Sequence, residues 1–155
     1  MAVVRATRLA VADMARRRAP GLFIMINSWP PWTWRGDAPG VLNMISSIAG
    51  RKIPAMGAIP DSSVYSATKY AVTALCETLR LEFSYSGLPI RVTSLSPGAV
   101  DTQMLHTVIA NNPLLKDKIP MLKPKDIADA VLYVLSTPDS VNISEMTVQV
   151  TGEIV

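Results

Sequence analysis

The stretch SSVYSATKYAVTALCETLRLEFSYSGLPIRVTSL, residues 62–95, decides the fold that this chain can adopt. Its first part predicts a helix over 62–86, because apolar residues recur on one side at helical spacing: Val72, Leu75, Leu79 and Phe83. Polar residues at 61–63 can cap this helix, and Gly87 ends it. Residues 90–95 then predict a strand. A helix followed at once by a strand is the repeating unit of an α/β fold.

The remaining C-terminal residues continue this alternation. Residues 96–98 predict a break, and 101–120 predict a loop with one or two irregular helical turns. Pro124 starts the next helix and Pro138 lies beyond its end, with an apolar face made of Ile127, Val131, Val134 and Leu135. A last strand is expected over 146–150. The predicted fold class is therefore α/β, a parallel sheet covered by helices.

The N-terminal part is less regular. A helix is expected over 3–18. Two apolar runs follow, 19–28 and 38–47, which both begin with Ala-Pro-Gly, and each predicts a short buried strand. The linker 29–36 contains two prolines and three tryptophans and suits neither strand nor helix. Since a compact sheet after one helix ordinarily needs only one such strand, we expect an irregular insertion near 22–40. A proline-motif ligand for a partner is the alternative for this linker.

Composition indicates one domain, residues 1–155, with a hydrophobic core. Of the 155 residues, 49% are hydrophobic and 17% are charged, and the formal net charge is +3, far from the signature of disorder. No apolar run approaches the roughly 18 residues that a membrane-spanning helix requires. The cations are scattered among acidic residues except at 16–18, so no nucleic-acid partner is expected. The arginine-rich N-terminus leaves a mitochondrial presequence open as an alternative to the helix.

The cysteine and histidine content bounds the redox chemistry and the metal chemistry of the chain. One cysteine, Cys76, excludes an internal disulfide, and together with the single histidine, His106, it cannot close a zinc site of the usual kind. No metal is expected, and a reducing, cytoplasmic location fits best. We expect Cys76 to be a packed side chain and His106 to be an exposed residue.

Tyr65 and Lys69 form the most informative pair of polar residues. They are four residues apart near the start of a predicted helix, so their side chains share one face with about 5–6 Å between Cβ atoms. A free phenol has a pKa of about 10 and is a poor proton donor or acceptor at neutral pH. A lysine cation about 4 Å away favours the phenolate. The pair can therefore move protons.

Ser47 completes a candidate site. It follows a predicted strand at the start of a glycine-containing turn, where its hydroxyl can face a crevice at the carboxyl end of the sheet and hold a carbonyl oxygen. The three groups suit proton transfer to an oxygen while a hydride moves between an alcohol and a ketone carbon, and that hydride needs a cofactor. Without a cofactor, the alternative is that Ser47 caps a turn, Tyr65 packs and Lys69 is solvated.

Three motifs resemble a known family. The stretches SSIAG at 46–50, YSATK at 65–69 and SPGAVDT at 96–102, in this order, are similar to the second half of short-chain dehydrogenases/reductases (SDRs), whose fold is Rossmann-like. The resemblance implies that Ser47 positions the substrate oxygen and that Tyr65 is the acid/base. It also implies that Lys69 favours the Tyr65 phenolate and hydrogen-bonds the nicotinamide ribose.

The same resemblance implies a cofactor and a substrate class. The residues expected to contact the cofactor, NADP, are Tyr65, Lys69, Pro97, Gly98, Val100 and Thr102. The run over 65–75 is most similar to NADP-preferring members, and 103–120 correspond to the variable substrate lid. The expected activity is that of an NADP-dependent oxidoreductase. It would interconvert a small-molecule secondary alcohol, or an isoprenoid-like or steroid-like alcohol, and its carbonyl.

One part of the family pattern is missing. Members open with a glycine-rich T-G-x-x-x-G-x-G turn that cradles the dinucleotide phosphates, whereas the eight glycines of this chain contain no G-x-G. We therefore expect a truncated chain that lacks the N-terminal nucleotide-binding half. The alternative function is an inactive SDR fragment that acts, if at all, as an interaction partner. Pairing through the helices at 3–18 and 62–86, as in the family, predicts a homo-oligomer.

Overall fold

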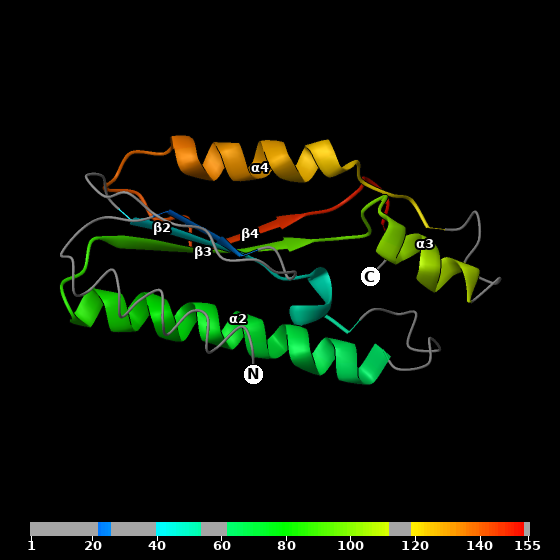
Figure 1. Ribbon diagram of the computed structural model, residues 1–155, viewed down its shortest axis with the longest axis horizontal. Coiled ribbons are helices and arrows are strands. Elements are labelled where there is room, and N and C mark those ends of the chain that lie inside the picture. Colours follow the sequence, from blue (N-terminus) through cyan, green and yellow to red (C-terminus); the bar gives the residue numbers. More distant parts are fainter. Residues whose placement is uncertain (1–21, 26–39, 54–61, 112–118, 154–155) are drawn as a thin grey trace.

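The computed structural model describes residues 22–25, 40–53, 62–111 and 119–153. Within these residues a four-stranded sheet has the order β1-β2-β3-β4, and every neighbouring pair is parallel. The strands are β1 (Leu22–Met25), β2 (Gly40–Ile45), β3 (Ile90–Pro97) and β4 (Glu145–Val148). The predicted α/β class with a parallel sheet is therefore confirmed (Figure 1).

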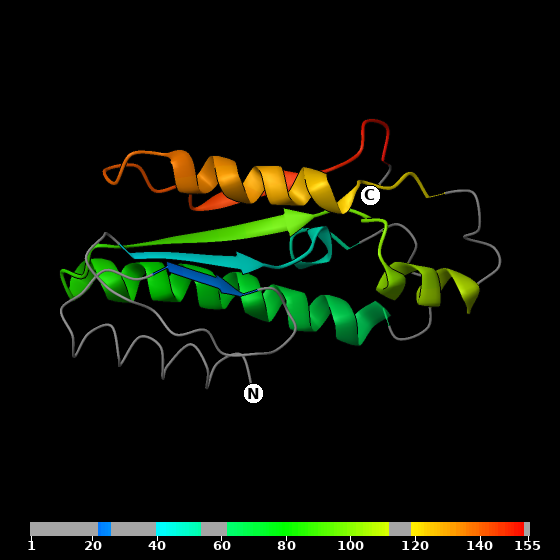
Figure 2. The same cartoon turned by 45° about the horizontal axis from the view of Figure 1, so that its top comes forward.

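Two long helices cover the two faces of the sheet. Helix α2 (Ser62–Tyr85) lies on one face and α4 (Pro124–Ser136) on the other, as both views show (Figures 1 and 2). The core on the α2 side contains Leu42, Met44, Cys76, Leu79, Phe83 and Val92. The core on the α4 side contains Leu95, Leu122 and Ile127. Both helices begin where the sequence predicts, and none of the described helices has the length and hydropathy needed to cross a bilayer.

Cys76 is buried in the core beneath α2, as expected. Burial raises the pKa of the Cys76 thiol to about 11. The thiol is therefore protonated at neutral pH and serves as a small packing group, because only the thiolate is nucleophilic.

The two similar apolar runs near the N-terminus both form strands. β1 pairs with β2 in a parallel register from Leu22 opposite Val41 to Met25 opposite Met44. The expectation that the sheet needs only one of them is wrong, because β3 occupies one edge of β2 and leaves the other edge free to pair. Residues 22–25, at the start of the predicted insertion, are therefore regular. The predicted helix at 3–18 and the tryptophan-rich linker lie outside the described residues.

The structure corrects three predictions in the C-terminal part. β3 continues through Ser96 and Pro97, which pair with Thr147 and Val148, so the predicted break begins only after this strand. A regular helix, α3 (Gln103–Ala110), stands where irregular turns were expected, because Thr102 caps it by accepting a hydrogen bond from the Leu105 amide. The last strand ends at Val148, two residues earlier than predicted.

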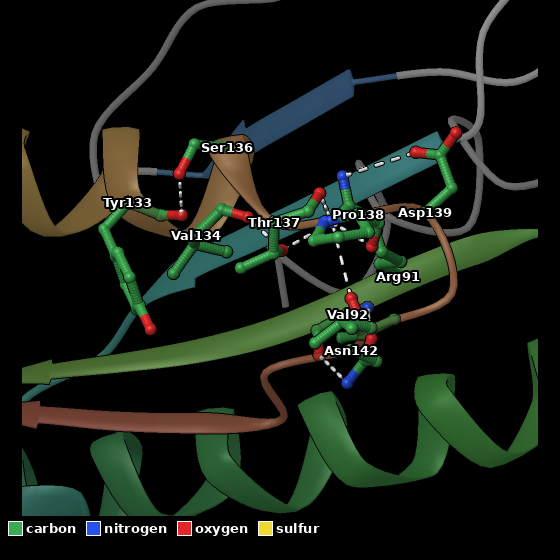
Figure 3. A network of polar contacts seen from close by, with 10 residues as sticks. Arg91, Val92, Tyr133, Val134, Ser136, Thr137, Pro138, Asp139 and Asn142 are labelled. Carbon is green, nitrogen blue, oxygen red and sulfur yellow. Dashed lines mark hydrogen bonds and ion pairs between the residues drawn. The ribbon is translucent and has the colours of Figure 1, made fainter.

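Arg91 fastens the end of α4 to the start of β3 (Figure 3). Its side chain is 10% exposed, and Nη1 donates to the Thr137 carbonyl at 2.9 Å and to Thr137 Oγ1 at 2.7 Å. Beside it, Asn142 accepts from the Val92 amide at 2.7 Å and donates to the Val92 carbonyl at 3.2 Å. These bonds fix the loop between α4 and β4 against the central strand.

Replacing this buried guanidinium should destabilise the fold. We expect Arg91→Lys to lower the free energy of unfolding by about 1–3 kcal/mol, because one ammonium cannot satisfy the same forked set of acceptors. Urea denaturation of the two proteins measures the difference. The matched control is Arg80→Lys, at an exposed arginine paired with Glu77, which should leave the denaturation midpoint unchanged. Equal midpoints for the wild type and Arg91→Lys would contradict the assignment.

Candidate active site

The end of β2 leads directly into the first part of the site. Ser46 extends the sheet pairing by donating its amide to the Leu95 carbonyl at 2.7 Å, and the 3-10 helix η1 (Ile48–Gly50) follows. Ser47 lies between them, half-buried, and its Oγ accepts from the Ala49 amide at 3.2 Å. The hydroxyl therefore caps the turn, as one alternative predicted, and its own proton is still available for donation.

The turn after Ser47 packs tightly on α2. A Cβ added at Gly50 would lie 2.7 Å from the Lys69 carbonyl oxygen, so the approach requires glycine. Thr73 Oγ1 donates to the Gly50 carbonyl at 3.1 Å, and Ser46 Oγ donates to the Lys69 carbonyl at 3.3 Å. These contacts place the strand end beside the helix turn that carries Lys69.

Lys69 is buried between that turn and Tyr65. Only 5% of its surface is exposed, and Nζ donates to the Ser46 carbonyl at 3.2 Å. The same Nζ lies over the Tyr65 ring, 5.5 Å from its centroid, whereas Tyr65 itself is 40% exposed. Burial lowers the pKa of the Lys69 ammonium from its ordinary value, because the charged form loses hydration.

This geometry decides between the alternatives for Lys69. The side chain is not solvated; it is held by the protein and faces an aromatic ring at a distance typical of a cation–π contact. One of its three N–H donors goes to Ser46, which leaves two for a ligand or for other partners. The Lys69 cation thus lies between the exposed Tyr65 phenol and Ser46, the neighbour of Ser47. Such an arrangement can move a proton to a bound oxygen.

The remaining predicted residues form one turn after β3. Pro97 is the buried last residue of the strand, and the Gly98 amide donates to the Val148 carbonyl at 2.8 Å. Val100 forms an isolated parallel bridge with Leu122, and Thr102 caps α3. Because the described strands are parallel, the turns that follow β2 and β3 lie at the same carboxyl end of the sheet (Figure 1).

The predicted lid carries an exposed apolar helix. No residue of α3 is buried, and Met104 and Val108 are exposed. His106 is exposed as expected, and its Nε2 lies 2.7 Å from Asp101 Oδ1. The helix begins directly after the 97–102 turn, which brings an apolar surface to the same end of the sheet.

Sequence reasoning missed Glu153. Its Oε1 accepts from the Ala99 amide at 3.1 Å, in the middle of the turn expected to contact the cofactor. A Cβ at Gly98 would overlap this carboxylate, and Oε2 is buried with no hydrogen-bond partner among the described residues. No local pattern signals such a contact, because Glu153 and Ala99 are 54 residues apart in the sequence.

The buried ammonium makes the stability of the chain depend on pH. The folded pKa of Lys69 lies below its ordinary value of 10.5, so between these two values the unfolded chain binds more protons than the folded chain. The free energy of unfolding of the wild type should therefore rise, relative to Lys69→Met, as pH increases through this window. Urea denaturation of both proteins at several pH values measures the difference. A difference independent of pH would contradict the burial of a charged Lys69.

Known proteins are similar to part of this chain. The family model for short chain dehydrogenase matches residues 21–113. The farnesol dehydrogenase of Aedes aegypti is 41% identical over 109 residues, which are 70% of this chain and 41% of that protein. Dehydrogenase/reductase SDR family member 11 of Homo sapiens is 38% identical over 122 residues, 76% of this chain and 45% of that protein. The chain thus spans less than half the length of these curated relatives.

Solved structures show the same partial coverage. Serine dehydrogenase from Escherichia coli superimposes with a TM-score of 0.57 at 25% identity, over 92% of this chain and 45% of that chain. The closed form of a serine dehydrogenase complexed with NADP+ has a TM-score of 0.55 at 27% identity, over 70% of this chain and 43% of that chain. The described fold therefore corresponds to part of a larger Rossmann-like fold.

Proposed function

The chain belongs to the short-chain dehydrogenase family, and on that premise we propose that it takes part in the NADP(H)-dependent interconversion of a secondary alcohol and its carbonyl. The observation that carries the proposal is the buried Lys69 ammonium, held by the Ser46 carbonyl 3.2 Å away and lying 5.5 Å from the centre of the Tyr65 ring. A cytoplasmic location, expected from the cysteine content, belongs to the same proposal.

The residues present fit one end of the cofactor. Lys69 and the 97–102 turn lie at the carboxyl end of the sheet, where open α/β folds bind ligands, and two Lys69 donors have no partner among the described residues. Tyr65, Lys69, Pro97, Gly98, Val100 and Thr102 would hold the nicotinamide end. The phosphate end has no corresponding glycine-rich turn in this sequence. When bound, the nicotinamide supplies or accepts the hydride.

Three side chains would orient the substrate and move the proton: Ser47, Tyr65 and Lys69. Ser47 donates a hydrogen bond from its hydroxyl to the substrate oxygen and holds that oxygen in place. In the reducing direction Tyr65 gives its proton to that oxygen as the carbonyl carbon receives the hydride, and in the oxidising direction it takes the proton back. Lys69 stabilises the phenolate that forms and donates to the cofactor ribose.

An isoprenoid-like or steroid-like alcohol is the substrate class that we propose. The supporting observation is α3, whose apolar side chains Met104 and Val108 are exposed beside the candidate site. An aliphatic ligand covering such side chains gains about 25 cal/mol for each Å² of apolar surface removed from water. The Aedes aegypti relative is named for a substrate of this kind.

The second candidate function is an inactive fragment that binds a partner through its helices. The absence of a G-x-G turn favours it, because the phosphates of a dinucleotide would lose most of their contacts. Exposed residues also recur at alternating spacings of three and four along α2: Val64, Ala67, Ala71, Ala74, Thr78, Leu81 and Tyr85. This spacing is typical of a helix seam, and it supports pairing of two copies in either function.

Cofactor titration and one tyrosine variant test the enzymatic proposal. The chain should bind NADPH saturably, and Tyr65→Phe should lower the turnover number by about 10²–10⁴, because the proton donor and acceptor is lost. The matched control is Tyr70→Phe, an equally exposed tyrosine on the same helix, which should keep wild-type turnover. No detectable binding at millimolar NADPH would reject the enzyme and favour the inactive fragment.

The helix seam is tested separately by its effect on association. Ala74→Glu should raise the dissociation constant of the homodimer about tenfold or more, because two like charges would meet across the seam. Sedimentation equilibrium measures the change. Ala128→Glu, at an exposed alanine on α4, provides the control and should leave association unchanged. Wild-type association of Ala74→Glu would exclude α2 from the interface.

A further inference from the structure

The chain after β4 folds back onto the turn that follows β3. The Gly98 amide donates to the carbonyl of Val148, the last residue of β4, at 2.8 Å. A tight turn then reverses the chain, and the Glu153 amide donates to the Val150 carbonyl at 3.0 Å. The turn after β3 and the turn after β4 are thereby brought together at the carboxyl end of the sheet, where the candidate site lies.

The Glu153 carboxylate is seated directly on this turn. Its Oε1 accepts a hydrogen bond from the Ala99 amide at 3.1 Å. The approach depends on Gly98, because a Cβ at that position would overlap the carboxylate. Gly98, which has no side chain, therefore leaves the space that the Glu153 carboxylate occupies.

The turn is held from two sides. Leu122 pairs with it through the backbone, donating to the Ala99 carbonyl at 2.8 Å and accepting from the Asp101 amide at 2.8 Å. Glu153 holds the amide of the same Ala99. Without the carboxylate, the Ala99 amide would lose its bond, and the turn would be held by Leu122 and by the bond from the Gly98 amide to Val148.

Burying the Glu153 carboxylate has an energetic cost that a purely structural contact does not explain. Its Oε2 is buried and has no hydrogen-bond partner in the part of the chain that the structure describes, and an acceptor without a partner destabilises a fold. Buried polar atoms without partners are uncommon in native proteins and call for an explanation, and functional sites are one place where that cost is tolerated. The contact lies at the centre of the 97–102 turn, the segment that we propose to bind the nicotinamide end of the cofactor.

We propose that Glu153 is a positioning residue for the cofactor: by holding the Ala99 amide it fixes the turn through which Gly98 and Val100 contact the nicotinamide end. This inference rests on the proposed function. Glu153 acts through the backbone of the turn and does not itself take part in hydride or proton transfer. Its acceptor oxygen matters, and its negative charge does not.

Two substitutions separate the acceptor from the charge. Glu153→Ala removes both, whereas Glu153→Gln keeps an acceptor oxygen and removes only the charge. We expect Glu153→Ala to raise the dissociation constant for NADPH about tenfold, the effect of losing one such bond, and Glu153→Gln to restore it to within about twofold of the wild type. Glu145→Ala removes an exposed carboxylate that pairs with Arg51, and it should not change NADPH affinity.

Fluorescence titration with NADPH and amide exchange at Ala99, both on the full chain, provide the readouts. Exchange at Ala99 should be faster in Glu153→Ala than in the wild type or in Glu153→Gln, while the Lys69 backbone amide, inside α2, keeps its protection. This local change accounts for the affinity loss without global unfolding. Rescue by glutamine is the result that a purely electrostatic role cannot produce.

Three outcomes overturn the inference. Equal NADPH affinity of Glu153→Ala and the wild type shows that the turn needs no such support. Tighter binding by both variants shows that the carboxylate repels the dinucleotide instead of preparing its site. Absence of NADPH binding by the wild-type chain overturns the proposed function and this inference with it, and that result is distinct from the other two.

Discussion

The close packing of η1 against α2 at Gly50 and Lys69 is the constraint on which the rest of the site depends. Glycine lets the turn after β2 approach the helix backbone, and the Ser46 carbonyl then lies within 3.2 Å of Lys69 Nζ. A buried ammonium needs such a partner, because an unpaired charge in the interior is costly. The contact therefore ties the end of a strand, the cation and Tyr65 into one unit.

The sheet gives this unit its place in the molecule. β3 is buried along nearly its whole length between α2 and α4, as in parallel sheets covered on both faces. Arg91 and Asn142 secure the loop after α4 to the start of the same strand. Because neighbouring strands are parallel, the turns that follow β2 and β3 lie at the same carboxyl end of the sheet. A ligand bound there can contact both turns.

Family membership and site geometry carry different parts of the functional conclusion. The match over residues 21–113 establishes lineage, whereas the chain spans less than half of the relatives named above. The groups that we propose for proton transfer lie together within this part of the fold, and the sequence carries no G-x-G turn for the dinucleotide phosphates. The proposed activity therefore depends on how much binding free energy the nicotinamide end of the cofactor gains from the 97–102 turn.

The sequence by itself determined the local features of this protein: the amphipathic pattern of α2, the proline at the start of α4, and the four-residue spacing of Tyr65 and Lys69. These follow from interactions within a few residues. Only the tertiary structure decided that both apolar runs pair as β1 and β2 and that Glu153 reaches the amide of Ala99. Such contacts join distant segments, and their geometry depends on how the whole sheet is assembled, which no local pattern records.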